Sequence, residues 1–449
     1  MGSNQKRKFL LAVLVLIVWA ATAALGIYRS GDGSNDFDTF YTAGKSVLDK
    51  TGIYYVGDYY QMRPDIGPFL YPPIAACFFS LFAFFPISIA AVLWVTFLLA
   101  IFIGSLFLTF QILGLKREER AAFFEATPIR ERLFLFFVGT VFLIDNLAMM
   151  QINILVFFLC LLSVLFWQKK QSMLAGMILS AAIFLKLTPI LFCLYFLTKK
   201  AWKIMLGVLI GSLIWSVVIP TLFFGLENNR IYHRQWFGRM IKPSIIDVLN
   251  KIKPEDTHPR KKSLTEMRHL AADEQFIDTN QSLEAALTRL LSKDRFEHYV
   301  THRYKKLPVL GGGISREKLG VLLSALKLAL LAVCVYLWAR RKDITDNLKI
   351  ALEISLVFLT MTLLSPVTRS HYYVVWIFAY LTLFLVRYRM SGHKRLSESK
   401  FFFQTANLSA CLYLLLALPY GEAVGMGAWA NLIFWVGCVH QFKISGQSV

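Results

Sequence analysis

Long apolar segments recur along almost the whole chain, and they constrain its fold more than any other feature. A helix needs roughly 20 apolar residues to cross a bilayer, and in lipid every backbone polar group has to be hydrogen-bonded inside a helix or a closed barrel. Charged residues make up only 17% of the 449-residue chain, against roughly 25% in soluble domains. The pattern therefore predicts an all-α polytopic membrane protein. The apolar segments span residues 9–28, 70–85, 87–112, 133–149, 152–167, 173–185, 188–198, 203–223, 319–339, 348–364, 372–388, 401–418 and 424–440.

Proline interrupts the apolar pattern at two places. Residues 173–185 and 188–198 are separated by Lys186-Leu187-Thr188-Pro189. Proline breaks or kinks a helix and disfavours helix at the residue before it, and a broken helix at membrane depth is tolerated only where it lines a protein cavity. Pro86 divides residues 70–112, for which we expect a short re-entrant piece followed by a full span. In total we expect about 12 transmembrane helices, with re-entrant or broken ones among them.

Short clusters of Lys and Arg between the apolar segments orient the chain. The net charge of +20 is spread over these clusters, so it does not indicate nucleic-acid binding. Cytoplasmic loops carry an excess of Lys and Arg, which predicts that both termini are cytoplasmic together with the basic clusters at 168–171, 199–203, 340–342 and 387–395. The opposite, extracytoplasmic face is then formed by residues 36–71, 145–151, 186–189, 225–318, 365–371 and 419–427.

One hydrophilic segment divides the chain. Residues 225–318 form an extracytoplasmic insertion between an N-terminal transmembrane module, 1–224, with its first outside loop at 29–71, and the C-terminal transmembrane helices, 319–449. The first apolar segment is long enough to span, and we expect an uncleaved anchor. Within the insertion, Gln281–Leu291 is predicted to be a short helix because Leu283, Ala286, Leu287 and Leu290 share a face.

Cysteines and sequence motifs exclude several classes of protein. All six cysteines lie inside apolar segments without CxxC spacing, so we expect small hydrophobic side chains and no disulfide bonds or metal site. No HExxH, Walker loop or GxSxG sequence occurs, and no predicted cytoplasmic domain is large enough to hold a nucleotide. A nucleotide-driven enzyme or pump is therefore disfavoured.

Polar side chains gather on the predicted extracytoplasmic face. Such residues at membrane depth are costly and usually line a functional cavity. Each also has a structural explanation: a solvated loop for the acids, snorkelling for Lys186, a helix cap for His371, and hydrogen bonds between helices for Gln151 and Asn153. Their presence on one face favours a shared site. The residues are Asp36, Asp38, Tyr71, Asp145, Asn146, Gln151, Asn153, Lys186, Arg369 and His371.

This set of side chains suits the transfer of a group that is linked to phosphate. Lys and Arg in a dry cavity hold phosphate, Arg through two hydrogen bonds and Lys as a point charge. Fixed cations stabilise a departing phosphate, and a carboxylate takes the proton of an attacking hydroxyl.

Several short motifs occur in one order and resemble glycosyltransferase family 87 over about residues 35–375. Each motif is weak alone, but together and in this order they are specific. They are D-F-x-x-F-Y-x-A-G at Asp36–Gly44, G-I-Y at Gly52–Tyr54, F-x-Y-P-P at Phe69–Pro73, Q-I-N at Gln151–Asn153, L-K-L-T-P at Leu185–Pro189, N-Q-S-L at Asn280–Leu283 and S-P-x-x-x-x-H at Ser365–His371.

The resemblance implies a GT-C-type fold in a bacterial cytoplasmic membrane, with the active site on the extracytoplasmic side. Members use a polyprenyl-phosphate sugar, usually mannose, and transfer it to a hydroxyl of a glycolipid or glycan. The family includes a mycobacterial enzyme that extends phosphatidylinositol mannosides through an α-1,2 linkage. Inversion of a β-linked donor implies one direct displacement, a single general base and an α-linked product.

The resemblance also implies a role for each matching residue. Asp36 is expected to be the base, and Lys186, Arg369 and His371 are expected to bind the donor phosphate. No cofactor, metal or nucleic acid is expected, and the partners are the donor lipid, the acceptor and membrane lipids. The Thr368-Arg369-Ser370 sequence, where the family often has an aromatic residue, and the long basic stretch 225–279 leave the acceptor open. Residues expected to line the substrate pocket are Asp38, Tyr41, Tyr71, Asn146, Gln151, Asn153 and Asn280.

Two other classes stay open. A transporter or flippase of lipid-linked sugars also uses broken helices and a central polar site, but it usually has two related halves, and the polar residues here gather at one face. A noncatalytic assembly subunit would leave no reason for an acid, a lysine and a histidine to gather together.

Overall fold

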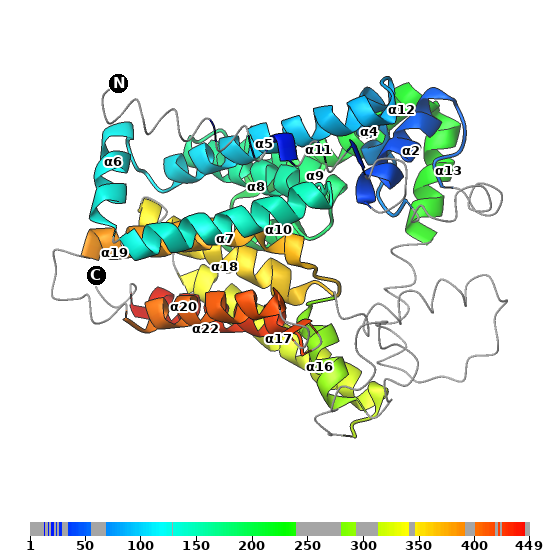
Figure 1. The fold of residues 1–449 in the computed structure, drawn as a ribbon. Coiled ribbons are helices and arrows are strands. Elements are labelled where there is room, and N and C mark those ends of the chain that lie inside the picture. Colours follow the sequence, from blue (N-terminus) through cyan, green and yellow to red (C-terminus); the bar gives the residue numbers. More distant parts are fainter. Residues whose placement is uncertain are drawn as a thin grey trace. The chain divides into compact units, whose positions relative to one another are not determined.

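The computed structural model of the protein is helical throughout the part that it describes (Figure 1). It describes residues 35–54, 69–127, 129–238, 280–292, 313–340, 346–390, 400–417, 421–422 and 424–444, with single positions between 13 and 28. Within these residues there is no β-strand, only an isolated bridge between Ser292 and Ile314. The principal helices are α2 (Asp36–Leu48), α4 (Pro73–Ala83), α5 (Ile87–Ile112), α6 (Arg117–Ala126), α7 (Ile129–Ala148), α8 (Asn153–Gln168), α9 (Ser172–Leu185), α10 (Ile190–Thr198), α11 (Trp202–Leu213), α12 (Ile219–Phe224), α13 (Leu226–Trp236), α16 (Leu283–Leu291), α17 (Arg316–Arg340), α18 (Asn347–Leu364), α19 (Trp376–Met390), α20 (Lys400–Leu414) and α22 (Met426–Ile444).

These helices follow the predicted apolar segments closely. Five helices in the described residues are long and apolar enough to cross a membrane, namely Ile87–Ile112, Trp202–Phe224, Glu317–Arg340, Asn347–Leu364 and Ser370–Arg389. The chain is thus an all-α, multi-pass membrane protein. The larger predicted number of spans and the sidedness of the loops stay predictions. The short piece before Pro86 is confirmed in its length, since α4 has 11 residues and covers only about 16 Å, whereas α5 has 26.

The chain forms two compact units. Unit 1 comprises Met1–Thr109, Gly139–Ile190 and Ala201–Ser244, and unit 2 comprises Phe110–Val138, Leu191–Lys200 and Ile245–Val449. The chain passes between the units several times, so neither unit is a continuous stretch of sequence. The division at 224 and 318 stays a prediction.

Small residues allow close helix packing in unit 1. A Cβ atom on Gly176 would lie 2.1 Å from the Ile204 carbonyl oxygen, and one on Gly207 would lie 2.1 Å from the Met173 carbonyl oxygen. The backbones of α9 and α11 therefore touch. Gly207 and Gly211 repeat at the four-residue spacing that membrane helices use for such contacts.

A wide turn interrupts the spanning helix that continues from α11 to α12. Residues Ile214–Val218 form a π-helical turn, and Pro220 has no N–H to offer the carbonyl of Ser216 one turn earlier. The side chain of Asn229, on α13, supplies the missing donor, because its Nδ2 lies 3.0 Å from the Ser216 carbonyl oxygen. The link fixes α13 against the end of the spanning helix.

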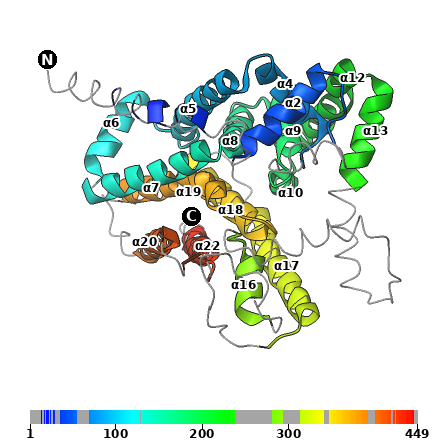
Figure 2. The same ribbon diagram turned by 45° about the vertical axis from the view of Figure 1, so that its right-hand side comes forward.

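The interior of unit 2 is built on α18 and α19. In the apolar windows of these two helices, 78% and 83% of the residues are buried, against 28% for α17. Helices α20 and α22 lie side by side (Figure 2). Inside this unit Lys199 Nζ lies 2.6 Å from Glu353 Oε1, and both side chains are at most 3% exposed.

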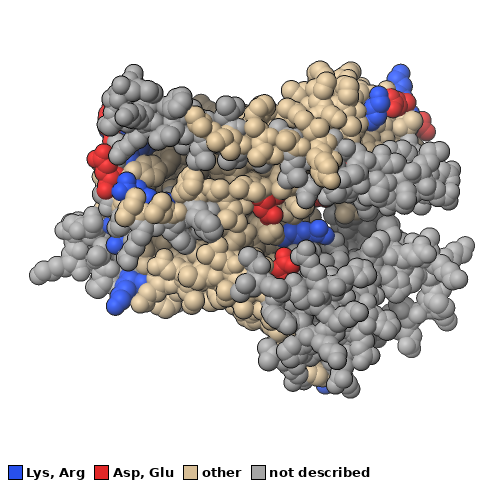
Figure 3. All heavy atoms as spheres, in the orientation of Figure 1, with Lys and Arg blue, Asp and Glu red and all other residues tan. Residues whose placement is uncertain are grey.

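Among the described residues on the face drawn in Figure 3, uncharged side chains predominate, and Lys, Arg, Asp and Glu gather in a few clusters. Large exposed apolar residues include Phe107 on α5, Leu209 on α11 and Leu328 on α17. In water such exposure would be costly, but on a helix that crosses a bilayer these side chains face lipid.

Candidate functional site

Helix α2 presents the two acids of the first motif in different environments. Asn35 caps the helix, since its Oδ1 accepts from the backbone N–H groups of Phe37 at 2.9 Å and Asp38 at 3.3 Å. Asp36 is exposed, whereas Asp38 is 0% exposed. The stretch that the sequence places in an outside loop is therefore helical from Asp36 to Leu48. Of the two carboxylates, only that of Asp36 is accessible to a substrate in this conformation.

The other residues of this motif hold α2 on α4. The ring of Phe40 stacks on Phe79 with a centroid separation of 4.5 Å, and a Cβ on Gly44 would lie 2.6 Å from the Phe79 backbone. Phe37, Phe40 and Gly44 follow one another at helical spacing on one face. The aromatic and glycine positions of the motif thus have a packing role, and Asp36 lies beside this face.

Two tyrosines that the sequence assigns to the substrate pocket take part in fixing this region. Tyr41 donates a hydrogen bond from its hydroxyl to the Phe85 carbonyl at 2.9 Å, which ties α2 to the turn before α5. The Tyr71 carbonyl accepts from the Tyr54 hydroxyl, and the Tyr71 ring lies 4.9 Å from that of Phe40. Both side chains are partly exposed.

The turn between α7 and α8 carries a group of buried amides. Asn146 is 0% exposed and donates from Nδ2 to the Phe142 carbonyl at 2.9 Å. Met150 has a positive φ of 51°, and Gln151 N–H returns to the Asn146 carbonyl at 3.0 Å, which is the usual closure of a helix C-terminus. Trp94 on α5 donates to the Met150 carbonyl at 2.9 Å. Gln151 and Asn153 are therefore held in fixed positions.

Lys186 lies at the break that the sequence predicts. Helix α9 ends at Leu185, and Lys186 has an extended backbone, with φ −156° and ψ 129°. Its Nζ donates a hydrogen bond to Asn153 Oδ1. An ammonium can only donate hydrogen bonds, so Asn153 has to present its Oδ1 to Lys186. Its Nδ2 is therefore directed away from Lys186. That Nδ2 is buried and has no acceptor among the described residues.

Contacts within unit 1 join the helix of Asp36 to the break at Lys186. The rings of Phe37 and Trp94 stack at a centroid separation of 6.4 Å. Trp94 bonds to the Met150 carbonyl, three residues before Asn153, which accepts from Lys186. The helix that carries Asp36 and the break at Lys186 are thus linked by a chain of contacts within one unit.

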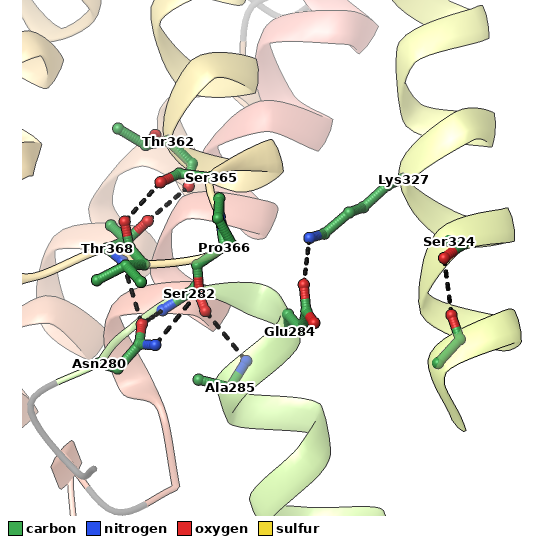
Figure 4. Close-up of polar contacts among 12 residues, drawn as sticks. Asn280, Ser282, Glu284, Ala285, Ser324, Lys327, Thr362, Ser365, Pro366 and Thr368 are labelled. Atoms are coloured by element: carbon green, nitrogen blue, oxygen red, sulfur yellow. Dashed lines mark hydrogen bonds and ion pairs between the residues drawn. The ribbon is translucent and has the colours of Figure 1, made fainter. Parts of the chain in front are cut away.

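Unit 2 carries the remaining predicted residues, Arg369 and His371 in its Ser365–His371 segment and Asn280 just before α16. Figure 4 shows the amide of Asn280 directed at this segment from the start of α16. Asn280 Oδ1 accepts from Thr368 N at 3.1 Å and from Ser282 N at 3.0 Å, and its Nδ2 donates to the Pro366 carbonyl at 3.3 Å. The predicted helix at 281–291 is confirmed, beginning two residues later at Leu283.

Arg369 and His371 come one and three residues after Thr368, which Asn280 binds. Arg369 is extended, with φ −109° and ψ 165°, and precedes the 3-10 helix Ser370–Val375. Its side chain is partly exposed, whereas His371 is only 4% exposed, in ring contact with Tyr372 at 5.0 Å. Asp36 and Lys186 thus lie in unit 1 and Arg369 and His371 in unit 2, and the convergence of these residues stays a prediction.

Comparison with known proteins decides the family. The family model described as Glycosyltransferase family 87 matches residues 69–366, which is more than half of the chain. The chain belongs to glycosyltransferase family 87. The matched region includes the motifs around Tyr71, Gln151, Lys186 and Asn280, and it reaches the start of the Ser365–His371 segment.

Two curated relatives are mycobacterial. The first, from Mycolicibacterium smegmatis, is a polyprenol-phosphate-mannose-dependent alpha-(1-2)-phosphatidylinositol pentamannoside mannosyltransferase, 28% identical over 200 residues, or 43% of this chain and 45% of the relative. The second, from Mycobacterium tuberculosis, is the corresponding phosphatidylinositol mannoside mannosyltransferase, 27% identical over 209 residues, or 44% of this chain and 48% of the relative. This family 87 chain thus matches about half the length of each. No solved structure matches it significantly.

Sequence reasoning overlooked the roles of three polar residues in this family 87 chain. Glu353 lies within an apolar segment, and neither its ion pair with Lys199 nor its 2.7 Å hydrogen bond from the Tyr195 hydroxyl has a sequence motif. The backbone N–H of Gln281 donates to the Thr368 carbonyl and so helps to hold the Ser365–His371 segment. Gln281 lies in the N-Q-S-L motif and Thr368 in the S-P-x-x-x-x-H motif, but neither motif indicates this hydrogen bond. The cysteines, by contrast, are all free, as expected.

Proposed function

We propose that the chain transfers mannose from a polyprenyl-phosphate donor to a hydroxyl of a glycolipid or glycan on the extracytoplasmic side of a bacterial cytoplasmic membrane. The observation that carries this proposal is Lys186, a cation at a break between apolar helices in a family 87 protein, hydrogen-bonded to a buried amide. Polar groups at such a break line a functional cavity more often than they face lipid.

Asn153 adds a feature that suits a phosphate. Its Nδ2 is a buried donor without an acceptor in the described part of the chain. The ammonium of Lys186 donates a hydrogen bond to Oδ1 of the same amide. A buried donor without an acceptor is costly. A phosphate oxygen bound beside Lys186 supplies both a negative charge and a hydrogen-bond acceptor.

The chemistry of the transfer is a single displacement. The acceptor oxygen attacks C1 of the mannose and gives its proton to the carboxylate of Asp36. The bond from C1 to the phosphate oxygen breaks, and its electron pair leaves with the polyprenyl phosphate, whose negative charge is bound by Lys186, Arg369 and His371. Attack opposite to a β-linked phosphate inverts C1 and gives an α linkage, which we propose to be α-1,2 to a mannose-bearing lipid, as in the names of the relatives. No divalent metal enters these steps, so EDTA should leave the rate unchanged.

Transfer can be tested in membranes with radiolabelled polyprenyl-phosphate mannose, followed by identification of the labelled lipid or glycan. Asp36→Asn should lower the transfer rate by about 10²–10⁴-fold, the usual contribution of a general base. Asp49→Asn is the matched control, because Asp49 is an exposed acid at the other end of α2, in an ion pair with Lys45. It should transfer at nearly the wild-type rate.

Two other outcomes would contradict parts of the proposal. Full activity in Asp36→Asn would exclude Asp36 as the base and direct attention to Asp38. No transfer by the wild type, together with movement of the intact labelled lipid across vesicle membranes, would favour a flippase.

A further inference from the structure

Asn280 joins the start of α16 to the Ser365–His371 segment, which is distant from it in sequence. Its side chain bonds to Thr368 N and the Pro366 carbonyl, as described above, and also to Ser282 N at the start of α16. The neighbouring backbone extends the link, since Gln281 N–H donates to the Thr368 carbonyl at 2.5 Å. At 2% exposure, Asn280 is shielded from water, so these hydrogen bonds do not compete with solvent.

The other side of Asn280 is anchored as well. Arg289 on α16 donates from Nη1 to the Asn280 carbonyl at 2.9 Å and from Nη2 to the Glu422 carbonyl at 3.3 Å. Helix α16 is in turn bound to α17, because Lys327 Nζ lies 2.5 Å from Glu284 Oε2. Figure 4 shows this ion pair on the far side of α16 from Asn280. Asn280 is therefore a fixed point against which the Ser365–His371 segment can be positioned.

The segment needs such a support. Between the end of α18 at Leu364 and the 3-10 helix at Ser370, no regular helix orders the backbone. The carbonyl of Pro366 and the N–H of Thr368 are the groups that Asn280 binds. Arg369 is the next residue, and His371 follows two positions later. A shift of the backbone at Thr368 is therefore passed directly to the side chains of Arg369 and His371.

We propose that Asn280 is a positioning residue for sugar transfer, which sets the Ser365–His371 segment so that Arg369 and His371 bind the donor phosphate. This inference rests on the proposed function. It gives Asn280 a role through other residues, rather than the contact with substrate that the sequence predicts.

Gln281 provides a matched control. Its side chain reaches a different segment, since Nε2 donates to the Glu422 carbonyl at 2.8 Å and Oε1 accepts from Gly427 N at 3.2 Å. Gln281→Ala therefore removes buried hydrogen bonds from the same cluster while leaving the amide of Asn280 on Pro366 and Thr368. A merely structural role for the cluster would make the two alanine variants equivalent.

The first experiment measures steady-state transfer by the purified full chain. Asn280→Ala should lower kcat/KM for the donor by about 10–100-fold, within the loss expected from misplacing binding groups by about 1 Å, while KM for the acceptor stays unchanged. Gln281→Ala should stay within about 2-fold of the wild type, because Asn280 keeps its bonds to Pro366 and Thr368 and the binding groups are not misplaced. Equal losses in both variants, or a loss confined to the acceptor KM, would overturn the proposal.

The second experiment does not depend on transfer. Binding of polyprenyl phosphate is measured for the wild type, Asn280→Ala, the Arg369→Ala/His371→Ala variant and the triple variant. If Asn280 acts through these two residues, its replacement weakens binding in the wild type but adds little to the double variant. Additive losses would refute this. Binding by a wild type that transfers no sugar would instead reject the proposed function alone, and no binding at all would reject both.

Amide hydrogen exchange of the free protein checks the structural step. The peptide containing Thr368 should exchange faster in Asn280→Ala than in Gln281→Ala, because its N–H loses its acceptor. Unchanged exchange in Asn280→Ala would show that Asn280 does not hold the segment.

Discussion

The buried ion pair of unit 2 allows a quantitative prediction. Glu353 lies six residues into α18, about 9 Å along the helix, and its Oε1 is 2.6 Å from Lys199 Nζ. Its Oε2 accepts from the Tyr195 hydroxyl at 2.7 Å, and Lys199 also donates to the Trp338 carbonyl at 2.9 Å. One carboxylate therefore links α10 to α18, and Lys199 links α10 to α17.

The expected cost of removing this carboxylate follows from these contacts. Glu353→Leu removes the carboxylate that pairs with Lys199, whose side chain is 2% exposed, and removing one partner of a buried pair costs roughly 3–5 kcal/mol. The hydrogen bond that the Tyr195 hydroxyl loses accounts for about 1 kcal/mol of this. Replacing both partners, as Lys199→Met/Glu353→Leu, should cost much less, because two apolar side chains of similar size leave no charge.

The assay is thermal unfolding of the purified protein in detergent, followed by tryptophan fluorescence, for the wild type, Lys199→Met, Glu353→Leu and the double variant. We expect the double variant to unfold at a higher temperature than Glu353→Leu, with a coupling between the two sites of at least about 1 kcal/mol. If the double variant is as unstable as Glu353→Leu, the cost lies in lost packing and the electrostatic reasoning is refuted.

Three further predictions concern unit 1. Lys186→Met should raise KM for the donor by about 10–100-fold, the value of a hydrogen bond to a charged group, and an unchanged donor KM would remove Lys186 from the phosphate site. Burial lowers the pKa of His233 below its ordinary 6.5, and the hydrogen bond to the Asn229 carbonyl opposes this only in part. The unfolded chain therefore binds the proton more tightly than the folded chain. The contribution of neutral His233 to stability is fully present above about pH 6.5 and is lost as the pH is lowered through the folded pKa. The unfolding temperature of His233→Gln should therefore fall less on acidification than that of the wild type. Gly207→Ala should destabilise by about 1–3 kcal/mol, because its methyl group would meet the backbone of α9 at 2.1 Å, whereas Gly139→Ala, with nothing within 4 Å, should not; equal unfolding temperatures would contradict the close packing.

The helices could be predicted from the sequence because apolar length is a local property. The break at Lys186, the short piece before Pro86 and the helix after Ser282 all follow from proline and from apolar periodicity. The π-helical turn at Ile214–Val218 could not be predicted, since it depends on Asn229 reaching the Ser216 carbonyl from the next helix. The Lys199–Glu353 pair was missed for the same reason: its partners are 154 residues apart in the sequence.

The candidate site could be predicted only in part from the sequence, because a motif contains residues that pack helices together as well as residues that act on the substrate. In the first motif, Phe37, Phe40 and Gly44 pack α2 on its neighbours. In the N-Q-S-L motif, Asn280 binds backbone groups of another segment. The sequence marks these positions as strongly as it marks Asp36, and only the contacts distinguish the two kinds.

That distinction also separates the two acids of the first motif. A general base has to be ionised and has to reach the acceptor hydroxyl. Asp36 is the first residue of a 13-residue helix, where the helix dipole favours a negative charge, and its side chain is exposed. Asp38 shares the first turn but is 0% exposed, so it would have to leave its packed position before meeting a substrate. Exposure therefore favours Asp36 as the base on grounds independent of the motif, and a large loss of transfer in Asp36→Asn beside an active Asp49→Asn would support both arguments at once.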